Sequence, residues 1–371
     1  MPSGRKAKIS AKLTLVRVAA VGALVALSVP HGVAAETLLE PIGFVAVTNG
    51  EGSLQISQFK LDGTPLRRLT TGPTDHNYPS LSRDGTRLVF TGEEGGIPEI
   101  YTRPFAVGGT ATQITHPPVT ATSASWSPDG KRLVYSALPP GTRAYEIFVS
   151  AADGSNPVQL THTTDSGNTQ PAFSPDGTRI AYISGGAPPQ ARATGPPTGF
   201  TNRVWVMEAD GSGAAKLTAG PRDAYPQWLD DGTVLFARED LATQTSRIVS
   251  ITLGGAERNL SPPEHFIEPR PLPDGRSYGA TVADAAGLHL VRVSRTDGSP
   301  LEAAGDEGFE VRRLGVPSTE GSAFTMSWVL AESRAATPSR AQPIAVYVLC
   351  AFGLAALIGA GVVVGRRTSA C

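Results

Sequence analysis

Short apolar segments alternate along most of the chain with polar turns that end in Asp-Gly. The clearest example runs from an apolar segment at residues 124–126 (Ala-Ser-Trp), through a turn at 127–130 (Ser-Pro-Asp-Gly), to a second apolar segment at 132–135 (Arg-Leu-Val-Tyr). Gly at the end of such a turn tolerates the positive φ that a tight hairpin requires. The pattern therefore predicts a hairpin of two short antiparallel strands.

This turn recurs along the chain. Its five copies occupy residues 82–85, 127–130, 174–177, 229–232 and 272–275. Their final glycines are 43 to 55 residues apart. A fixed period of this length indicates one supersecondary unit of about forty-five residues that is repeated and stacked.

Each unit also contains a second Asp-Gly or Gly-Gly turn, which leads to a short outer strand. In five units that strand ends in Ile or Leu followed by a hydroxyl residue, at residues 69–70, 114–115, 160–161, 217–218 and 260–261. Four short antiparallel strands per unit are typical of a propeller blade. The sequence thus predicts an all-β propeller of four-stranded blades.

The number of blades follows from how the ring closes. Six outer hairpins but only five clear inner ones can be counted, and the missing inner strand falls at the amino terminus. Residues 322–328 have the composition to pair beside residues 43–61 and close the ring, which predicts six blades. Seven blades are the alternative, because residues 309–314 have no assigned place in the six-bladed count.

Two further features concern the surfaces of the blades. The position before each Asp-Gly turn is mostly large and apolar, as in Leu81, Trp126, Phe173, Trp228 and Pro271. We expect these side chains to pack between blades rather than to hold a ligand.

A Pro- and Gly-rich insertion at 185–202 separates the second and third strands of one blade. It is expected to be a tolerated surface insertion, with a partner-contacting loop as the alternative.

The repeats resemble those of the TolB-like propeller family, whose units carry a Trp-Ser-Pro-Asp-Gly turn and an Asp-Gly-x-x-x-x-x-Leu-Thr ending. Residues 126–130 and 153–161 match this pattern almost fully, and 173–177 and 210–218 match it nearly as well. The resemblance covers about residues 42–330. It implies an extracytoplasmic binding scaffold, or a gating and recognition domain attached to a hydrolase.

The two ends of the chain differ from the repeats. Residues 1–35 combine basic residues, a short apolar run and a small-residue cleavage pattern, which predicts a secretory signal peptide; an uncleaved membrane anchor is the alternative. Residues 343–365 are uncharged and long enough to span a bilayer. Arg366 and Arg367 follow directly and favour a cytoplasmic end. A processed sorting tail is the alternative for this segment.

These segments define the expected organisation: a propeller at 36–330, a linker at 331–342, a single transmembrane helix at 343–365 and a cytoplasmic tail at 366–371. The propeller is expected outside the cytoplasm, held at the cell membrane. The whole chain has a net charge of −1, and removal of residues 1–35 and the tail leaves about −8. An acidic body argues against a nucleic-acid partner, which requires a basic face.

The sequence lacks the common catalytic motifs. The sequence contains no Gly-x-Ser-x-Gly elbow, no His-Glu-x-x-His and no phosphate-binding Gly-Lys loop. Its two cysteines, Cys350 and Cys371, lie in the predicted helix and at the last residue. The turn aspartates are explained by turn geometry rather than by calcium. We therefore expect a protein that is not an enzyme and has no cofactor, and that binds envelope or extracellular proteins.

One polar cluster offers an alternative function. Four of the six histidines, His76, His116, His162 and His265, fall in the segments that join one blade to the next and are expected around one mouth of the central channel. The candidate ligand-binding residues there are Asp75, His76, His162, Asp165, Arg222, Asp223, His265 and Glu268. Such residues could hold a small ligand, or a metal for hydrolase or lyase chemistry, although their spacing carries no local metal signature.

Overall fold

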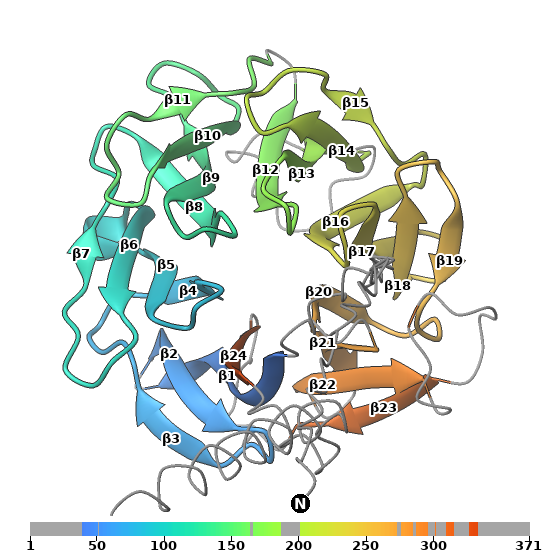
Figure 1. Ribbon diagram of the computed structural model, residues 1–371, viewed down its shortest axis with the longest axis horizontal. Coiled ribbons are helices and arrows are strands. Elements are labelled where there is room, and N and C mark those ends of the chain that lie inside the picture. Colours follow the sequence, from blue (N-terminus) through green and yellow to red (C-terminus); the bar gives the residue numbers. More distant parts are fainter. Residues whose placement is uncertain are drawn as a thin grey trace, which may run out of the picture. The chain divides into compact units, whose positions relative to one another are not determined.

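Six four-stranded antiparallel sheets are arranged around a central axis and form a six-bladed β-propeller (Figure 1). The computed structural model describes residues 39–50, 52–163, 166–186, 201–272, 276–284, 287–295, 301, 309–314 and 326–332. The predicted signal peptide, most of the 185–202 insertion and the predicted transmembrane helix lie outside these residues. Among the described residues no helix has the length and apolar character needed to cross a membrane.

In the second to sixth blades the strands follow one another in chain order, from the innermost to the outermost. The second blade contains β4 (His76–Leu81), β5 (Arg87–Gly92), β6 (Glu99–Pro104) and β7 (Thr112–Gln113), with a short 3-10 helix η1 (Glu94–Gly96) between β5 and β6. The third blade contains β8 (Thr120–Trp126), β9 (Arg132–Leu138), β10 (Glu146–Ala151) and β11 (Val158–Gln159). The fourth blade contains β12 (Gly167–Phe173), β13 (Arg179–Gly186), β14 (Arg203–Glu208) and β15 (Ala215–Lys216).

The last two full repeats have the same order. The fifth blade contains β16 (Arg222–Trp228), β17 (Thr233–Asp240), β18 (Thr245–Thr252) and β19 (Glu257–Asn259). The sixth blade contains β20 (Phe266–Pro271), β21 (Ser277–Asp284), β22 (Gly287–Arg295) and β23 (Phe309–Arg313). Residues 309–313 therefore form the outer strand of the sixth blade. The seven-bladed alternative is wrong, because the segment that prompted it completes a blade already counted.

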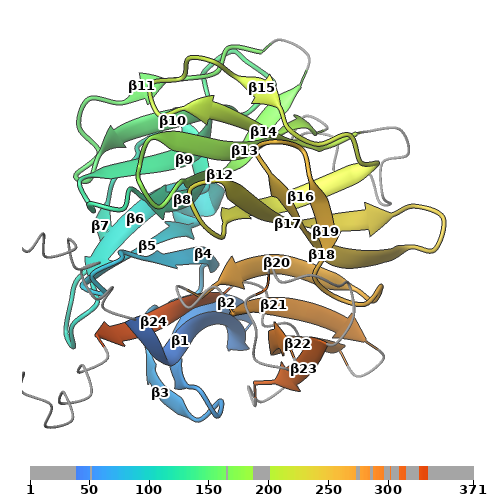
Figure 2. The same ribbon diagram turned by 45° about the vertical axis from the view of Figure 1, so that its right-hand side comes forward.

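The first blade combines the two ends of the propeller. It contains β1 (Leu39–Gly50), β2 (Ser53–Lys60), β3 (Pro65–Arg68) and, as its innermost strand, β24 (Met326–Glu332). β24 runs antiparallel beside β1, with Phe44 opposite Trp328 in the register (Figure 2). This pairing confirms the predicted closure of the ring, and the strand extends to Glu332, slightly beyond the expected domain boundary at 330.

The core lies between neighbouring blades. One apolar cluster joins Val89 and Ile100 of the second blade to Leu133 and Tyr135 of the third, and Trp126 is buried within it. The indole Nε1 of Trp126 donates a hydrogen bond to the Ser80 carbonyl oxygen of the preceding blade at 3.2 Å. Trp228 makes the equivalent bond to the Ala172 carbonyl at 3.0 Å. The aromatic position before the turn thus packs between blades, as predicted.

The Ser-Pro-Asp-Gly turn uses its own polar side chains. Ser127 Oγ donates to Asp129 Oδ1 at 2.6 Å, the Lys131 amide donates to the same oxygen at 3.1 Å, and Gly130 has φ of 65°. The Ser127 hydrogen bond is the main cause that lowers the pKa of the Asp129 carboxyl. The turn geometry therefore accounts for the repeated aspartates.

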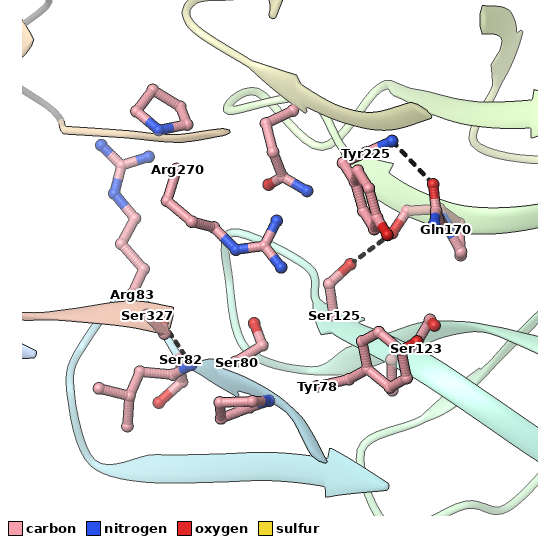
Figure 3. A pocket seen from close by; sticks show the side chains of 16 residues that line it. Tyr78, Ser80, Ser82, Arg83, Ser123, Ser125, Gln170, Tyr225, Arg270 and Ser327 are labelled. Atoms are coloured by element: carbon pink, nitrogen blue, oxygen red, sulfur yellow. Dashed lines mark hydrogen bonds between the residues drawn. The ribbon is translucent and has the colours of Figure 1, made fainter. Parts of the chain in front are cut away.

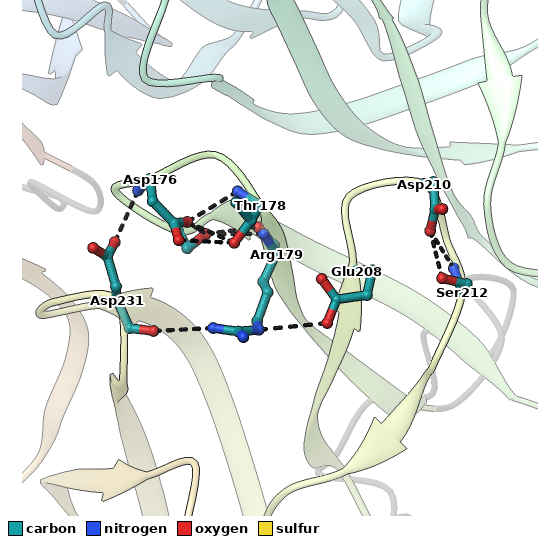
Figure 4. Close-up of polar contacts among 8 residues, drawn as sticks. Asp176, Thr178, Arg179, Glu208, Asp210, Ser212 and Asp231 are labelled. Carbon is teal, nitrogen blue, oxygen red and sulfur yellow. Dashed lines mark hydrogen bonds and ion pairs between the residues drawn. The ribbon is translucent and has the colours of Figure 1, made fainter.

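The same turns also connect blades. In the fourth blade the Asp176 amide donates to Asp231 Oδ1 of the fifth blade at 2.8 Å, and Arg179 Nη1 donates to the Asp231 carbonyl at 3.4 Å (Figure 4). Arg179 Nε also lies 3.5 Å from Glu208 Oε1 within its own blade. These contacts link adjacent turns on one face of the ring.

The hydroxyl residue at the end of the outer strand has a structural role as well. Thr161 Oγ1 accepts a hydrogen bond from the Ile147 amide at 2.8 Å. Four equivalent bonds join Thr70 to Ile56, Thr115 to Ile100, Thr218 to Val204 and Ser261 to Ile248. The hydroxyl caps a buried amide where the outer strand ends, which explains why these endings recur.

Candidate functional site

Each of five innermost strands contains a β-bulge at the same position. The register shifts between Asn77 and Ser80 in β4, and equivalent shifts occur in β8, β12, β16 and β20. Each bulge places one residue other than glycine at positive φ, between 50° and 57°: Tyr78, Ser123, Gln170, Tyr225 and Glu268. Positive φ is unfavourable for residues other than glycine, so the surrounding structure must stabilise it. Its repetition in five blades around one axis therefore marks a candidate functional site.

Side chains of neighbouring blades stabilise these bulges. The amide of Ser123 donates to Thr91 Oγ1 at 3.2 Å, and the amide of Gln170 donates to Ser136 Oγ at 3.1 Å. The amide of Tyr225 donates to Gln170 Oε1 at 2.7 Å. Backbone groups near the channel are thereby satisfied without a regular ladder.

The bulges surround a cavity of about 220 Å³ in the channel. Sixteen residues from all six blades line it, including Tyr78, Gln170, Tyr225 and, from β24, Ser327 (Figure 3). The lining also holds several serine hydroxyls and the amide of Gln227. The cavity is therefore rich in groups that can hydrogen-bond to a ligand.

The charged residues of this lining are all basic. Arg83, in the turn after β4, and Arg270, in β20, line the cavity, and none of the sixteen lining residues is acidic. Figure 3 shows the Arg270 side chain extending into the middle of the cavity, between the walls that carry Ser80 and Tyr225. Two guanidinium groups in one lining, together with hydroxyl and amide groups, favour an anionic group.

Glu268 lies beside this cavity without lining it. Its residue is 5 % exposed, and its Oε2 has no hydrogen-bond partner within the described part of the chain. Burial raises the pKa of the Glu268 carboxyl to about 8, and the charge of Arg270 opposes this rise only in part. Burial also raises the pKa of the Tyr225 hydroxyl, and the nearby Glu268 adds to that effect.

The raised pKa of Glu268 predicts how stability depends on pH. The folded protein retains a proton that the unfolded chain releases above the ordinary glutamate value of 4.5. The stability contributed by this group is complete below about pH 4.5 and is lost as the pH rises through about 8. Glu268→Gln remains neutral, so its free energy of unfolding relative to the wild type should increase across this window.

Urea denaturation of both proteins at about pH 5, 7 and 9 measures this difference. Glu264→Gln is the matched control, because Glu264 is exposed and close in sequence to Glu268. A constant difference between Glu268→Gln and the wild type at all three pH values would contradict the prediction.

The residues that the sequence analysis proposed as a ligand site occupy other positions. His76 begins β4, is 6 % exposed, packs against Phe90, and has Nε2 3.6 Å from Glu94 Oε1. Burial is the main cause that lowers the pKa of its imidazole. Asp75 Oδ1 accepts a hydrogen bond from the Leu54 amide at 2.7 Å. His162 is exposed, and Asp165 lies outside the described residues.

The remaining candidates lie in the fifth and sixth blades. Arg222 pairs with Glu239 at 2.8 Å, and the buried Asp223 pairs with Arg238 at 2.7 Å. Arg222 and His265 line a second cavity of about 370 Å³ near the amino-terminal ends of β16 and β20. The structure therefore brings these two predicted residues together, whereas none of the seven candidates that the structure describes lines the channel cavity. Their role in ligand binding stays a prediction.

No group of three or more His, Cys, Asp or Glu side chains suited to a metal occurs among the described residues. The sequence analysis named Glu268 but missed the other four bulge residues, Tyr78, Ser123, Gln170 and Tyr225, although a signal was present. Each lies three residues before the large apolar position, and four of the five precede a proline, namely Pro79, Pro171, Pro226 and Pro269. The position three residues before the large apolar residue is therefore equivalent in the five repeats, and it marks the residues that converge on the channel.

Comparison with known proteins finds relatives over part of the chain. It is 27 % identical over 157 residues to the "Uncharacterized peptidase YuxL" of Bacillus subtilis, which is 42 % of this chain and 23 % of that protein. It is 28 % identical over 178 residues to the Tol-Pal system protein TolB of Anaeromyxobacter dehalogenans, which is 47 % of this chain and 37 % of TolB. The chain thus matches less than two fifths of the length of either relative. No protein-family model matches it.

Solved structures show the same architecture. TolB from Acinetobacter baumannii has a TM-score of 0.60 at 17 % identity, covering 77 % of this chain and 66 % of that one. A putative TolB from Agrobacterium tumefaciens has a TM-score of 0.53 at 18 % identity, covering 74 % and 99 %. The closed ring and its lined channel define a six-bladed β-propeller with a central pocket. The chain shares this fold with the TolB structures, and its sequence is similar to TolB over part of its length, in agreement with the resemblance of the repeated turns.

Proposed function

We propose that this chain is a protein-binding propeller of the cell envelope that receives part of its partner in the central channel. The observation that carries the proposal is the ring of equivalent bulges, which presents Tyr78, Ser123, Gln170 and Tyr225 at one cavity. Half-buried polar and aromatic side chains that line a cavity on a rigid scaffold are suited to recognition. The similarity to TolB of the Tol-Pal system supports an envelope location.

A binding role is favoured over catalysis by the composition of the cavity. Its sixteen lining residues include serines and tyrosines but no His, Asp, Glu, Lys or Cys. The lining itself therefore supplies no general base of the usual types for a serine or tyrosine, and Glu268, beside the cavity, is not part of the lining. The peptidase name of one relative belongs to a protein of which this chain matches 23 %.

Site-specific photocrosslinking in living host cells tests the proposal. A photoreactive phenylalanine analogue replaces Tyr78 in the channel, and in a separate variant it replaces Val107, which is 88 % exposed outside the channel. We expect a discrete protein adduct from position 78 that is absent from position 107. No adduct at 78, or the same adducts at both positions, would overturn the proposal.

The proposal includes tethering to the membrane through residues 343–365, with the propeller outside the cytoplasm. Alkaline extraction of membranes should leave the full chain in the pellet and release a chain that ends at Gln342. Added protease should digest the propeller in spheroplasts without lysis. Release of the full chain by alkali would show that the segment is not an anchor.

A further inference from the structure

The fifth blade departs from the other repeats at one pair of small residues. Ala224 of β16 lies opposite Ala237 of β17, directly before the bulge residue Tyr225. Residues that face each other on antiparallel strands point to the same side of the sheet. In the other four blades with this bulge, the equivalent pairs are all larger: Asn77 and Thr91, Thr122 and Ser136, Thr169 and Ile183, and Ile267 and Thr281.

The second cavity, of about 370 Å³, lies at this pair of alanines. Arg222 and Glu239, the pair two residues further along the same two strands, form an ion pair at 2.8 Å and also line it. The lining is completed by other residues of the fifth blade, by the beginning of the sixth blade and by the residue before β14. The small side chains of the fifth blade therefore leave room where the other blades carry larger ones.

Polar side chains line the cavity beside its apolar residues. The polar residues other than the ion pair are Asn202, Gln244, Thr245, Ser246 and His265. Ser246 Oγ donates a hydrogen bond to the Phe266 carbonyl at 2.7 Å, which holds the start of β18 against β20. Amide and hydroxyl groups both donate and accept hydrogen bonds, so the lining suits a ligand that does the same.

The conformation of Gln244 is a further feature of this site. It is the last residue of the loop between β17 and β18 and has φ of 56°. Glycine adopts such a φ at less cost, and hairpin loops commonly use it there. The loop therefore keeps an amide side chain at the cavity although glycine would suit its backbone better.

The cavity has no excess of either charge. Arg222 is paired with Glu239, and none of the other nine described residues that line the cavity is Asp, Glu, Lys or Arg. An apolar ligand would displace water from the polar groups without replacing their hydrogen bonds. A saccharide ring carries hydroxyls at its edge and C–H groups on its faces, which match the polar groups and the apolar surface of Tyr225 and Ile267.

We infer that this cavity is a second binding site, which takes a neutral saccharide unit, either as a free sugar or within a glycan chain. Its volume falls in the range of roughly 300–1,000 Å³ that is usual for small-ligand sites. The inference goes beyond the proposed function, because Tyr225 is the only described residue that lines both this cavity and the channel cavity.

Saturation-transfer NMR on the purified full chain, in a detergent without a sugar headgroup, tests the inference. The neutral probes are methyl β-glucoside and, as a glycan chain, cellotetraose. Methyl β-glucuronide is the charged counterpart, cyclohexanol the apolar one and N-acetyltyrosinamide the peptide-like one. We expect methyl β-glucoside to bind at least about tenfold more tightly than cyclohexanol and about threefold more tightly than the glucuronide.

Ala224→Leu should weaken binding of methyl β-glucoside at least about tenfold, because it fills the cavity. The fold should tolerate this change, since the sixth blade carries Ile267 at the equivalent position. Ala256→Leu is the matched control, because Ala256 is exposed in a turn of the same blade outside the cavity. This control should bind the glucoside like the wild type.

Gln244→Gly should weaken binding about threefold to tenfold without lowering the midpoint of thermal unfolding, because it removes the amide and relieves the positive φ. A purely structural role of Gln244 would not weaken binding. Asn156→Gly is the matched control, since Asn156 also has positive φ, at 51°, in an exposed turn outside the cavity.

The outcomes separate the claims. Tighter binding of cellotetraose than of the glucoside supports a glycan chain as the source, and equal affinity supports a single sugar unit. No binding of the glucoside, or unchanged binding in Ala224→Leu, overturns the inference. If Ala224→Leu has no cooperative thermal transition, unchanged binding in Gln244→Gly overturns it instead.

Two further results would also overturn a neutral saccharide as the ligand. They are tighter binding of the glucuronide and tighter binding of N-acetyltyrosinamide than of the glucoside. The crosslink from position 78 reports on the channel cavity, which Ala224 and Gln244 do not line. Failure of the saccharide site and failure of the proposed function are therefore distinguishable.

Discussion

Ending the chain at Thr325 rather than at Ser333 is expected to abolish cooperative folding of the propeller. The two chains differ only by the segment that contains β24, which supplies the innermost strand of the first blade. Loss of β24 removes the backbone hydrogen bonds between β24 and β1, each of which contributes about 1 kcal/mol net to stability. It also exposes the surface where the first and last blades meet. We expect a decrease of roughly 4–8 kcal/mol in the free energy of unfolding.

Urea denaturation followed by far-UV circular dichroism and by tryptophan fluorescence measures this effect. The chain ending at Ser333 is the control, since it also lacks the predicted linker and transmembrane helix but retains β24. Coincident, unchanged transitions for both chains would show that the seam contributes little to stability.

Replacing Trp126 by Ala is expected to lower the free energy of unfolding by about 3–5 kcal/mol, the range for large-to-small changes in a core. The indole is 7 % exposed and packs between the second and third blades. It also lies under the Arg87 guanidinium, whose carbon is 4.3 Å from the ring centroid. Equilibrium urea unfolding measures the change.

Two further variants separate the contributions of Trp126. Trp126→Phe keeps most of the apolar contact but loses the hydrogen bond to the Ser80 carbonyl, and it should cost about 1–2 kcal/mol. Val158→Ala, on an exposed outer strand, should change stability by less than about 0.5 kcal/mol. If Trp126→Ala behaves like Val158→Ala, the aromatic position does not hold the blades together.

Much of the fold could be predicted because its determinants are local. The Asp-Gly turns require positive φ at Gly130 and its equivalents, and the strand order within a blade follows from the chain order. Even the closing strand could be predicted, because the first unit lacks an inner hairpin and a suitable segment remains near residue 326. The sixth blade was harder, because Phe309 to Arg313 lie far in sequence from the strand that they join.

The candidate site was predicted less well. The sequence drew attention to histidines and acids in the segments between blades, but the structure uses His76 in packing and Asp223 in an ion pair. The channel is lined instead by bulge residues such as Tyr78 and Tyr225, whose chemistry is ordinary when read one repeat at a time. They become a candidate site only because equivalent residues of different blades come together around the channel.

The sequence by itself determined the repeat, its turns, the four-stranded blade and the aromatic position between blades, because each depends on residues close together in the chain. Tertiary structure alone decided that four of the bulge residues line one cavity, that Arg83 and Arg270 both line it, and that Glu268 is buried. Proximity between blades and the loss of water around Glu268 depend on how distant repeats close into a ring. Local sequence does not encode either property.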